Sequence, residues 1–495
     1  MTSERISLRA RYQARYGIKK PLRGYQLKAA KVGVENDSFA LLMDPRLGKT
    51  RVDIAVTGYR FLQGQVTKWV IICPSIAKDV WETELADTLD IPYEVDIVEG
   101  RAKERALLLK GWKPSADKLS IMIINHEATW RLKKVLYKTN PQKVTVDESQ
   151  KIKNHAAKQS KTIHTLGKRA SYRTILTGTF LSKPTDAFSQ YKFLDPTIFG
   201  EKWKQDRWKR GGPGFLERYV DSYGFGGHKP ETFKNLDELG SKVASIAFQL
   251  TRQEAGGFPD EHYQTVHFEL TNPALKHYQE MMKHLKTVIR QAGRREEVIA
   301  EIVLTQVLRL QQITGGFLPM PNPDDDQLVN AAIGDDRIRA LRGIVEEYPQ
   351  TEPLVIFCRF RYELDAIINQ MKRMGRTVNF IAGGMRGSDR DRAKRDFQDG
   401  NIDTCVVQIR AGGIAIDLSR ADTGIFYSAT SSLIDYEQAK ARIISRTGGR
   451  VSLLSLAAKG TVDDDLIQSL QGKQDLVAAI LKRINCNGFT VESRS

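Results

Sequence analysis

Three neighbouring residues, Gly48, Lys49 and Thr50, have the types and order of a loop that holds nucleotide phosphates. They follow an apolar run at residues 39–43, which predicts a strand, and they open a predicted helix. A glycine lets backbone N–H groups approach phosphate oxygens, and the start of a helix adds a favourable dipole. Lys49 would contact the β- and γ-phosphates, and the Thr50 hydroxyl would ligate Mg²⁺. The complete loop pattern has a glycine where this chain has Met43, so an ordinary helix start is the alternative interpretation.

An acidic pair, Asp147 and Glu148, follows a second predicted strand at residues 144–146. Parallel sheets bind their ligands at the carboxyl ends of their strands, where this pair would lie. There Asp147 would hold a magnesium ion through water, and Glu148 would orient and deprotonate the attacking water. Taken alone, such a pair is usually a solvated turn or a helix cap. Its occurrence downstream of the phosphate loop favours nucleotide hydrolysis.

A third polar element, Thr177-Gly178-Thr179, ends another apolar run at residues 174–176. Its hydroxyls could hydrogen-bond the acidic pair and respond to loss of the γ-phosphate, although the segment alone is also an ordinary Thr/Gly turn. All three elements therefore depend on strands that end at one edge of a sheet.

The elements that must position these residues form two stretches in which short apolar runs alternate with amphipathic helices, as in a parallel α/β sheet. The runs are continuous and β-branched, as expected for strands covered by helices on both faces. The expected strands are 39–43, 69–73, 121–124, 144–146 and 174–176 in the first stretch, and 354–358, 377–381, 404–408, 424–427 and 451–456 in the second. Between the stretches, residues 275–312 predict a long helical stretch and residues 319–326 a Pro/Asp linker.

We therefore expect an α/β fold of two parallel-sheet lobes around a mostly helical middle. The expected parts are a basic arm at 1–20, a first lobe at 21–270 with a basic Gly/Trp insertion near 201–227, a helical segment and linker at 271–330, a second lobe at 331–482 and a tail at 483–495.

The composition of the 495-residue chain excludes several classes of protein. Hydrophobic residues make up 41% of it, too many for a disordered chain. No apolar run approaches the roughly 18–20 residues of a membrane span, and the amino terminus lacks the apolar region of a secretory signal. The four cysteines lie far apart and the eight histidines show no metal-ligand spacing. We expect neither a disulfide scaffold nor a zinc protein, and a cytoplasmic location.

The chain is strongly basic, with 76 Lys and Arg against 59 Asp and Glu and a net charge of +17. This charge suggests a polyanionic partner, such as nucleic acid or an acidic membrane surface, and a merely basic protein is the alternative. Residues 202–210 combine cations such as Lys202 and Arg207 with Trp203, which suits phosphate contact and base stacking. A solvated loop with its tryptophans packed on the lobe is the alternative here. Cations at 276–309 could likewise face DNA or only solvent.

In sequence order, these elements resemble the motifs of superfamily 2 helicases, specifically of the Swi/Snf-like branch of DNA translocases. The LRxYQ element of that branch is matched at 22–26, which would place Gln26 against adenine with Arg23 beside it. Motif Ia, which grips a DNA strand, would include Pro74, Ser75 and Trp81. The remaining matches in the first lobe are motif I at 43–50, the DEAH-RIKN octapeptide at 147–154 and motif III at 176–179.

The resemblance continues to about residue 481. The matches are the LRQI helix at 308–313, motif IV at 355–358, a glycine and arginine segment at 383–384 and 390–397, motif V at 408–418, motif VI at 438–446 and GTxD at 460–463. Motif VI contributes arginines that reach the nucleotide, here Arg442 and Arg446. Ser445 occupies the usual place of the second arginine, and Arg450 competes with Arg446 for that role.

Three further departures from the family pattern lie in the first lobe. Arg46 stands where the phosphate loop usually has glycine, Ser149-Gln150 replaces Ala-His, and Phe180 replaces proline. The resemblance implies two RecA-like lobes that close on ATP and Mg²⁺ and bind DNA. It implies nucleotide contacts from Gln26, Arg23, Arg46, Gly48, Lys49 and Thr50, metal contacts from Thr50 and Asp147, and hydrolysis by Lys49, Asp147, Glu148, Arg442 and Arg446. The expected DNA contacts are Pro74, Ser75, Thr177 and Arg410 in the motifs, together with Lys202, Trp203 and Arg207 of the basic segment.

Together these observations predict a DNA-dependent ATPase that translocates on duplex, forked or branched DNA, in replication, repair or recombination. The compact size resembles the small phage or bacterial members, some of which migrate branched DNA. We expect a monomer, in the host cytoplasm if the chain is phage-encoded. Two alternatives stay open: an RNA helicase of the same superfamily, and a nucleic-acid-binding scaffold with a degenerate ATP site, for which Arg46 and the displaced Arg446 argue.

Overall fold

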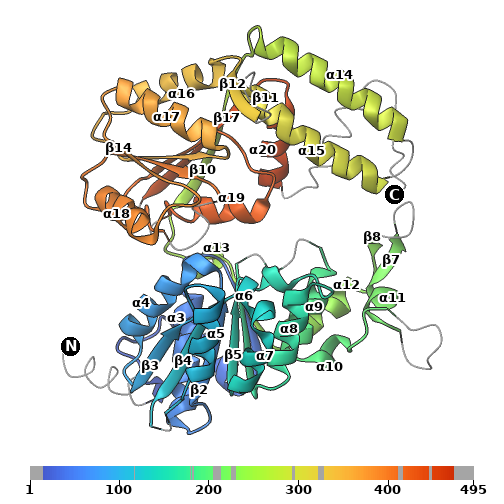
Figure 1. Ribbon diagram of the computed structural model, residues 1–495, viewed down its shortest axis with the longest axis vertical. Coiled ribbons are helices and arrows are strands. Elements are labelled where there is room, and N and C mark those ends of the chain that lie inside the picture. Colours follow the sequence, from blue (N-terminus) through green and yellow to red (C-terminus); the bar gives the residue numbers. More distant parts are fainter. Residues whose placement is uncertain are drawn as a thin grey trace. The chain divides into compact units, whose positions relative to one another are not determined.

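The computed structural model describes residues 15–115, 117–178, 180, 183–204, 213–223, 230–292, 296–321, 328–410, 416–444 and 449–472. The chain divides into two compact units, Met1–Gly256 and Gly257–Ser495, and each is built on its own parallel sheet (Figure 1). Among the helices in these ranges, none is long and apolar enough to cross a membrane.

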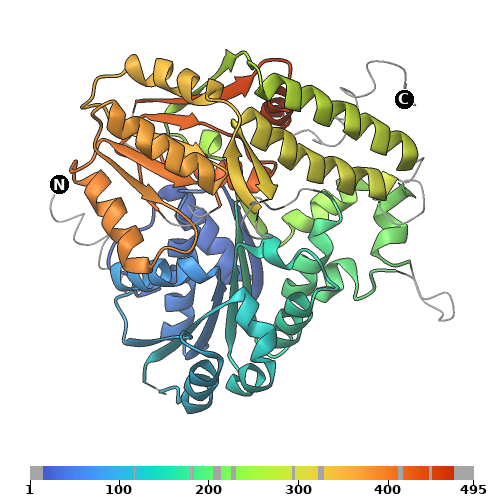
Figure 2. The same cartoon turned by 45° about the horizontal axis from the view of Figure 1, so that its top comes forward.

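The first unit is built on a sheet whose strands lie in the order β3-β4-β2-β5-β6-β1-β9. Every residue of β1 is buried, and only its alternate residues Ala40 and Leu42 belong to the core cluster on one face. Helices therefore cover both faces of the sheet, as Figure 2 shows. The strands are β1 Ser38–Met43, β2 Lys68–Cys73, β3 Tyr93–Ile97, β4 Leu119–Asn125, β5 Lys143–Asp147, β6 Tyr172–Thr177 and β9 Ala247–Leu250.

Helices and a small hairpin complete the first unit. The helices are α2 Gly24–Glu35, α3 Lys49–Leu62, α4 Lys78–Thr88, α5 Ala102–Gly111, α6 His126–Arg131, α7 Lys133–Leu136, α8 Lys158–Gly167, α9 Asp186–Leu194, α10 Pro196–Phe199, α11 Phe215–Tyr219, α12 Leu236–Ala244 and α13 Arg252–Ala255. Short 3₁₀ turns are η1 Ser75–Ala77, η2 Tyr137–Thr139 and η3 Ser149–Ile152, and the antiparallel hairpin is β7 Val220–Tyr223 with β8 Pro230–Phe233.

The second unit has a parallel sheet in the order β10-β17-β16-β13-β15-β14. Val355 and Phe357 of its central strand belong to one core cluster, whereas Leu354 and Ile356 belong to another on the opposite face. The strands are β10 Asp260–Phe268, β13 Leu354–Cys358, β14 Val378–Ile381, β15 Thr404–Gln408, β16 Thr423–Phe426 and β17 Arg450–Ala458. The helices are α14 Ala274–Ala292, α15 Glu296–Thr314, α16 Asp336–Glu346, α17 Arg361–Arg373, α18 Gly387–Gln398, α19 Leu433–Lys440 and α20 Val462–Gly472, and β11 Phe317–Pro321 pairs antiparallel with β12 Leu328–Ala332.

The expected fold class of two parallel-sheet lobes is confirmed, and all ten expected strands are present within one or two residues. Among the described strands of the two parallel sheets, the pattern missed β3, β9 and β10, which lie at sheet edges and have partly exposed side chains. Their sequences are consequently more polar than those of central strands. The omission of β10 shifted the expected end of the first lobe: residue 270 is wrong, because β10 pairs with β17 and the first compact unit ends at Gly256.

The helical middle also differs from its sequence-based description. The stretch 275–312 is two helices, α14 and α15, which lie side by side (Figures 1 and 2). Leu285 and Leu310 from these helices are buried in a core cluster of the second sheet, so the middle belongs to the second unit. The expected linker at 319–326 begins inside β11, and its remainder from 322 lies outside the described residues, as do the tail at 483–495 and the first fourteen residues of the arm.

Candidate nucleotide site

The segment between β1 and α3 forms the expected phosphate loop. Gly48 caps α3 with φ 79°, a left-handed conformation, and a Cβ atom there would lie 2.4 Å from Nε2 of Gln26. The backbone angle therefore favours glycine, and a larger residue would also displace the Gln26 amide. The Lys49 ammonium donates to the carbonyl oxygens of Met43 at 2.8 Å and Asp44 at 3.4 Å, so it is folded under the loop. Thr50, the next residue of α3, is half-buried.

Arg46 occupies the place of a family glycine and keeps a glycine-like backbone, with φ 73°. A side chain in this region costs about 1–2 kcal/mol relative to ordinary angles. The loop thus keeps its shape despite the substitution, at the expense of local strain.

Gln26 ties the start of α2 to the phosphate loop. Its Nε2 donates to the Leu47 carbonyl at 3.1 Å, and its Oε1 accepts from the Arg23 backbone N–H at 3.0 Å. The Gln26 side chain is buried, whereas Arg23 is exposed. The expected adenine contact of Gln26 would therefore be made by a group that also supports the loop.

The acidic pair lies at the carboxyl end of β5, as expected. Asp147 Oδ2 accepts from the Trp81 indole N–H at 2.9 Å, and its Oδ1 accepts from the Glu148 backbone N–H at 3.0 Å. Burial, with a smaller contribution from the Glu148 carboxylate, raises the pKa of Asp147 to about 7. Burial also lowers the pKa of Lys49, while Glu148 and Asp147 act in the opposite direction. The structure thus brings Lys49 and the acidic pair together in one site of low dielectric constant.

The chemistry of this site suits magnesium. Carboxylate and hydroxyl oxygens, as on Asp147 and Thr50, are the hard ligands that Mg²⁺ prefers, and phosphates and water usually supply the others. The charge of a magnesium ion, added to that of Lys49, would also favour the ionised form of the buried Asp147 carboxyl. Within the described ranges, no group of three or more His, Cys, Asp and Glu residues could hold a metal alone. The residues present therefore fit an ion that is shared with a nucleotide.

A relay of side chains fixes the carboxylate of Glu148. Gln150 Nε2 donates to Glu148 Oε2 at 2.6 Å, and Gln150 Oε1 accepts from the Thr177 hydroxyl at 2.8 Å. Thr177 is fully buried at the end of β6, so it does not offer the DNA contact assigned to it; it holds Gln150. Its hydroxyl bonds to Gln150, which in turn contacts the acidic pair, whereas the sequence suggested a hydrogen bond to the pair itself. Thr179 lies outside the described residues.

The other expected DNA contacts of the first unit divide into exposed and packed residues. Ser75 and Lys202 are exposed, whereas Pro74 is buried at the start of η1. Trp203 stacks on Phe215 with ring centroids 5.6 Å apart and also contacts His155 at 4.5 Å. This packing favours the alternative interpretation for Trp203, whereas Trp208 lies outside the described residues. Arg207 lies outside the described residues.

The expected arginines of the second unit have different surroundings. Arg410 is 76% exposed, with Asp435 Oδ2 3.9 Å from its Nε, whereas Arg442 follows α19 and is only 9% exposed. The Arg442 carbonyl accepts from the Leu418 backbone N–H at 3.0 Å. Asp463 of the GTxD segment forms a buried ion pair with Arg337. Arg446 lies outside the described residues.

A buried ion pair supports the phosphate-loop helix, and sequence reasoning missed it. Lys143 Nζ lies 2.6 Å from Asp53 Oδ1, and the Thr145 hydroxyl donates to Asp53 Oδ2 at 2.7 Å. Asp53 lies one turn after Lys49 on α3, and both charged side chains are at most 1% exposed. The only signal was a lysine at the head of an apolar strand.

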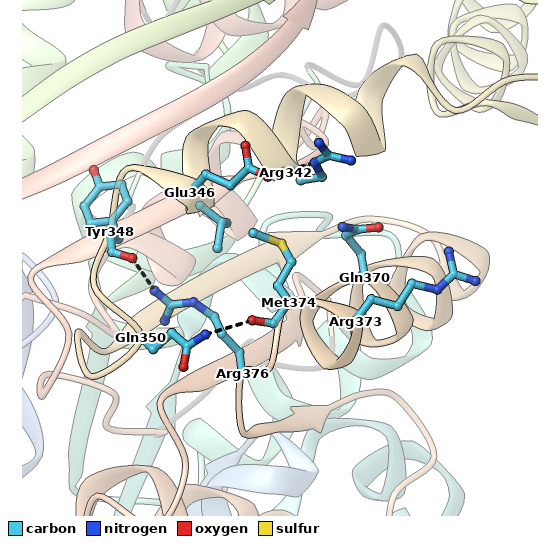
Figure 3. Close-up of a pocket in the computed structure, with 9 residues that line it drawn as sticks. Arg342, Glu346, Tyr348, Gln350, Gln370, Arg373, Met374 and Arg376 are labelled. Atoms are coloured by element: carbon cyan, nitrogen blue, oxygen red, sulfur yellow. Dashed lines mark hydrogen bonds and ion pairs between the residues drawn. The ribbon is translucent and has the colours of Figure 1, made fainter.

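Two surface pockets can be compared with the position of the candidate nucleotide site. One, in the second unit, lies where α16 and α17 end and before β13 begins, and Figure 3 shows Arg376 and Gln350 bound there to the carbonyls of Tyr348 and Met374. It lies at the amino edge of the strands, away from the edge where parallel sheets bind ligands. The other, in the first unit, lies beside the phosphate loop and is lined by Leu42, Asp44, Thr177, Gly178, Phe180, Gln249, Leu250, Thr251 and Glu254.

Comparison with known proteins gives two family matches. Residues 25–315 match the SNF2-related domain, and residues 336–447 match the Helicase conserved C-terminal domain. The mouse protein Chromodomain-helicase-DNA-binding protein 1-like is 22% identical over 477 residues, which are 93% of this chain and 50% of that protein. The Bacillus subtilis Putative ATP-dependent helicase/translocase YwqA is 23% identical over 459 residues, 89% of this chain and 46% of that protein. The chain thus spans about half the length of these two relatives.

Among solved structures, the Sulfolobus solfataricus SWI2/SNF2 ATPase core in complex with dsDNA is 21% identical. The match covers 92% of this chain and 92% of that one, with a TM-score of 0.44.

Proposed function

The chain belongs to the SNF2-related family of superfamily 2 helicases, and from this premise we propose that it is a DNA-dependent ATPase that couples ATP hydrolysis to movement along duplex DNA. The observation that carries the proposal is the cluster of Lys49, Asp147 and Glu148 at the carboxyl edge of the first sheet. Its members have the types, burial and mutual proximity that phosphoryl transfer to water requires.

Each residue has a distinct part in this reaction. Lys49 exchanges the carbonyl oxygens of Met43 and Asp44 for phosphate oxygens when a nucleotide enters. Glu148, oriented by Gln150, accepts a proton from the attacking water. Magnesium, when bound, neutralises phosphate charge, and Thr50 and Asp147 would hold it.

An arginine of the second unit would complete the site. Arg442 is the first candidate for this arginine and lies within the described residues. Arg446 is the second candidate and lies outside them. Arginine fingers of this kind contribute about 10³–10⁵ to the rate in related phosphoryl-transfer sites. Since the arginine and the acidic pair belong to different units, hydrolysis would depend on the units' coming together, and this dependence would couple it to movement.

The charge of the chain supports DNA as the track. The net charge of +17 and the exposed side chains of Ser75, Lys202 and Arg410 suit phosphate contacts that weaken as salt rises. We further propose that forked or branched duplexes are the preferred substrates, in fork remodelling or branch migration, and that the enzyme acts as a monomer in the cytoplasm.

The proposal is tested by ATP turnover without nucleic acid and with single-stranded, duplex and forked DNA and RNA. We expect duplex or forked DNA to stimulate turnover most, and absence of any stimulation by DNA would refute the proposal. Stimulation by RNA alone would instead identify an RNA helicase. A triplex-displacement assay beside a fork-unwinding assay then separates translocation from strand separation.

Two variants test the assigned roles. Lys49→Ala and Glu148→Gln should abolish hydrolysis and leave DNA binding intact. Lys28→Ala and Glu82→Gln make the same chemical changes at exposed positions and should leave turnover unchanged. Loss of DNA binding in a folded Glu148→Gln variant would contradict the placement of Glu148.

A further inference from the structure

The Trp81 indole is directed at the acidic pair rather than at solvent. Trp81 lies on α4 and is 1% exposed, and its Nε1 donates to Asp147 Oδ2 at 2.9 Å. The family resemblance associated this tryptophan with the segment that grips a DNA strand. Its burial excludes such a contact, so its role must be sought inside the unit.

The indole is held in place by a second tryptophan. The rings of Trp69 and Trp81 meet edge to face, with centroids 5.9 Å apart and planes at 84°. Trp69 is itself fixed, because its Nε1 donates to the Thr145 hydroxyl at 2.9 Å, and that hydroxyl donates to Asp53 on α3. One buried network therefore joins the phosphate-loop helix to the indole that contacts Asp147.

This network determines how the Asp147 carboxylate is presented. One of its oxygens accepts from the Trp81 indole and the other from the Glu148 backbone N–H. With one donor on each oxygen, rotation of the carboxylate about its terminal bond would break both hydrogen bonds. The N–H of Glu148 is backbone, so Trp81 is the side chain that a substitution can remove.

We propose that Trp81 is a positioning residue for the magnesium site: its N–H holds the Asp147 carboxylate in the orientation needed to bind the metal–nucleotide complex. This inference rests on the proposed ATPase function, because it concerns the same site. Trp81 acts through Asp147 and touches neither the nucleotide nor the reacting atoms.

A matched pair of variants isolates the N–H. Trp81→Phe and Trp69→Phe make the same change in two adjacent, buried rings, but only Trp81 donates to Asp147. The affinity for mant-ADP is measured by fluorescence in Mg²⁺ and in EDTA, and turnover is measured against Mg²⁺ concentration. For Trp81→Phe we expect roughly ten-fold weaker binding in Mg²⁺, the loss typical of one hydrogen bond to a charged group. Binding in EDTA should be unchanged, and high Mg²⁺ should restore turnover. Trp69→Phe keeps the indole donor of Asp147 and removes only part of the packing around it, so its loss of affinity in Mg²⁺ should be much smaller than that of Trp81→Phe.

Three outcomes would overturn the inference. Equal Mg²⁺ dependence of the two variants would show that the indole N–H is dispensable. An equal loss in Mg²⁺ and EDTA would show that Trp81 supports only the packing of the loop. If Trp81→Phe does not fold, benzothienylalanine at position 81 keeps the shape of the ring and replaces its N–H by sulfur; wild-type Mg²⁺ dependence of that protein would be equally decisive. Failure of the wild type to bind mant-ADP in any medium would instead refute the proposed function itself.

Discussion

Replacing Gln150 by alanine should slow ATP hydrolysis without weakening nucleotide binding. Gln150 is the link between Thr177 and the carboxylate of Glu148, and its side chain is 8% exposed. Glu148 itself has a left-handed backbone, with φ 50°. Without Gln150, the general base keeps its charge but loses the amide that aims it.

The size of the effect follows from the two hydrogen bonds. The bond from Gln150 Nε2 to the Glu148 carboxylate is 2.6 Å long, and a hydrogen bond to a charged group is worth about 1.5–3 kcal/mol. If that energy orients Glu148 for the reaction, its loss lowers kcat roughly 10- to 100-fold. The bond from Thr177 is between neutral groups, so Thr177→Val should lower kcat less than Gln150→Ala, by about ten-fold or less.

The assay is steady-state ATP hydrolysis with saturating duplex DNA, with kcat and KM determined separately. Gln159→Ala is the control, because Gln159 also donates one side-chain hydrogen bond, to the Lys151 carbonyl at 3.0 Å, but this exposed bond is not part of the relay. We expect wild-type kinetics for the control and a loss confined to kcat for Gln150→Ala. A wild-type kcat, or a loss carried wholly by KM, in a folded Gln150→Ala protein would refute the relay.

Three further predictions concern stability, measured by urea unfolding. Lys143→Met should cost about 3–5 kcal/mol because it leaves the Asp53 carboxylate buried and unpaired, while Lys143→Met with Asp53→Leu should cost much less; equal costs would contradict a buried charge pair. Arg46→Gly should be about 1 kcal/mol more stable than Arg46→Ala, since only glycine relieves φ 73°, and the reverse order would show that the loop relaxes. Burial lowers the pKa of His164 to about 4, so the folded state keeps its imidazole neutral. The contribution of His164 to the free energy of unfolding is therefore complete above pH 6.5 and is lost as the pH falls toward 4. His164→Gln should remove up to about 3 kcal/mol of this acid destabilisation, and an unchanged slope between pH 7.5 and 4.5 would contradict its burial.

The central strands could be predicted because burial on both faces leaves a strong pattern. β1 and β13 are continuous apolar runs, and their bounds follow closely from the residues alone. The edge strand β10 could not be recognised in this way, because its polar sequence fits a pairing with β17, about 190 residues later along the chain. The limit of the first lobe depended on that pairing, so the sequence misplaced it.

The same distinction applies to the site: residues set by local sequence could be predicted, and residues set by distant contacts could not. The types and spacing of Gly48, Lys49 and the acidic pair are local properties, since a phosphate loop and a strand end are each made by a few adjacent residues. The packed position of Trp203 depended on an aromatic cluster that its own basic segment does not reveal. From composition alone, base stacking and packing against the lobe stayed open as alternative roles of Trp203.

Two parallel-sheet lobes, a phosphate loop and an acidic pair could be predicted from the residues, because each follows from neighbouring positions and from the periodicity of buried strands. The side chains that hold the acidic pair could not, because they come from distant parts of the chain. Trp81 reaches Asp147 across 66 positions of the chain, and Lys143 reaches Asp53 across 90. Such partners become neighbours only when the sheet brings separate strands and helices to one edge, and a hydrogen bond of 2.6–2.9 Å depends on that packing rather than on any local pattern.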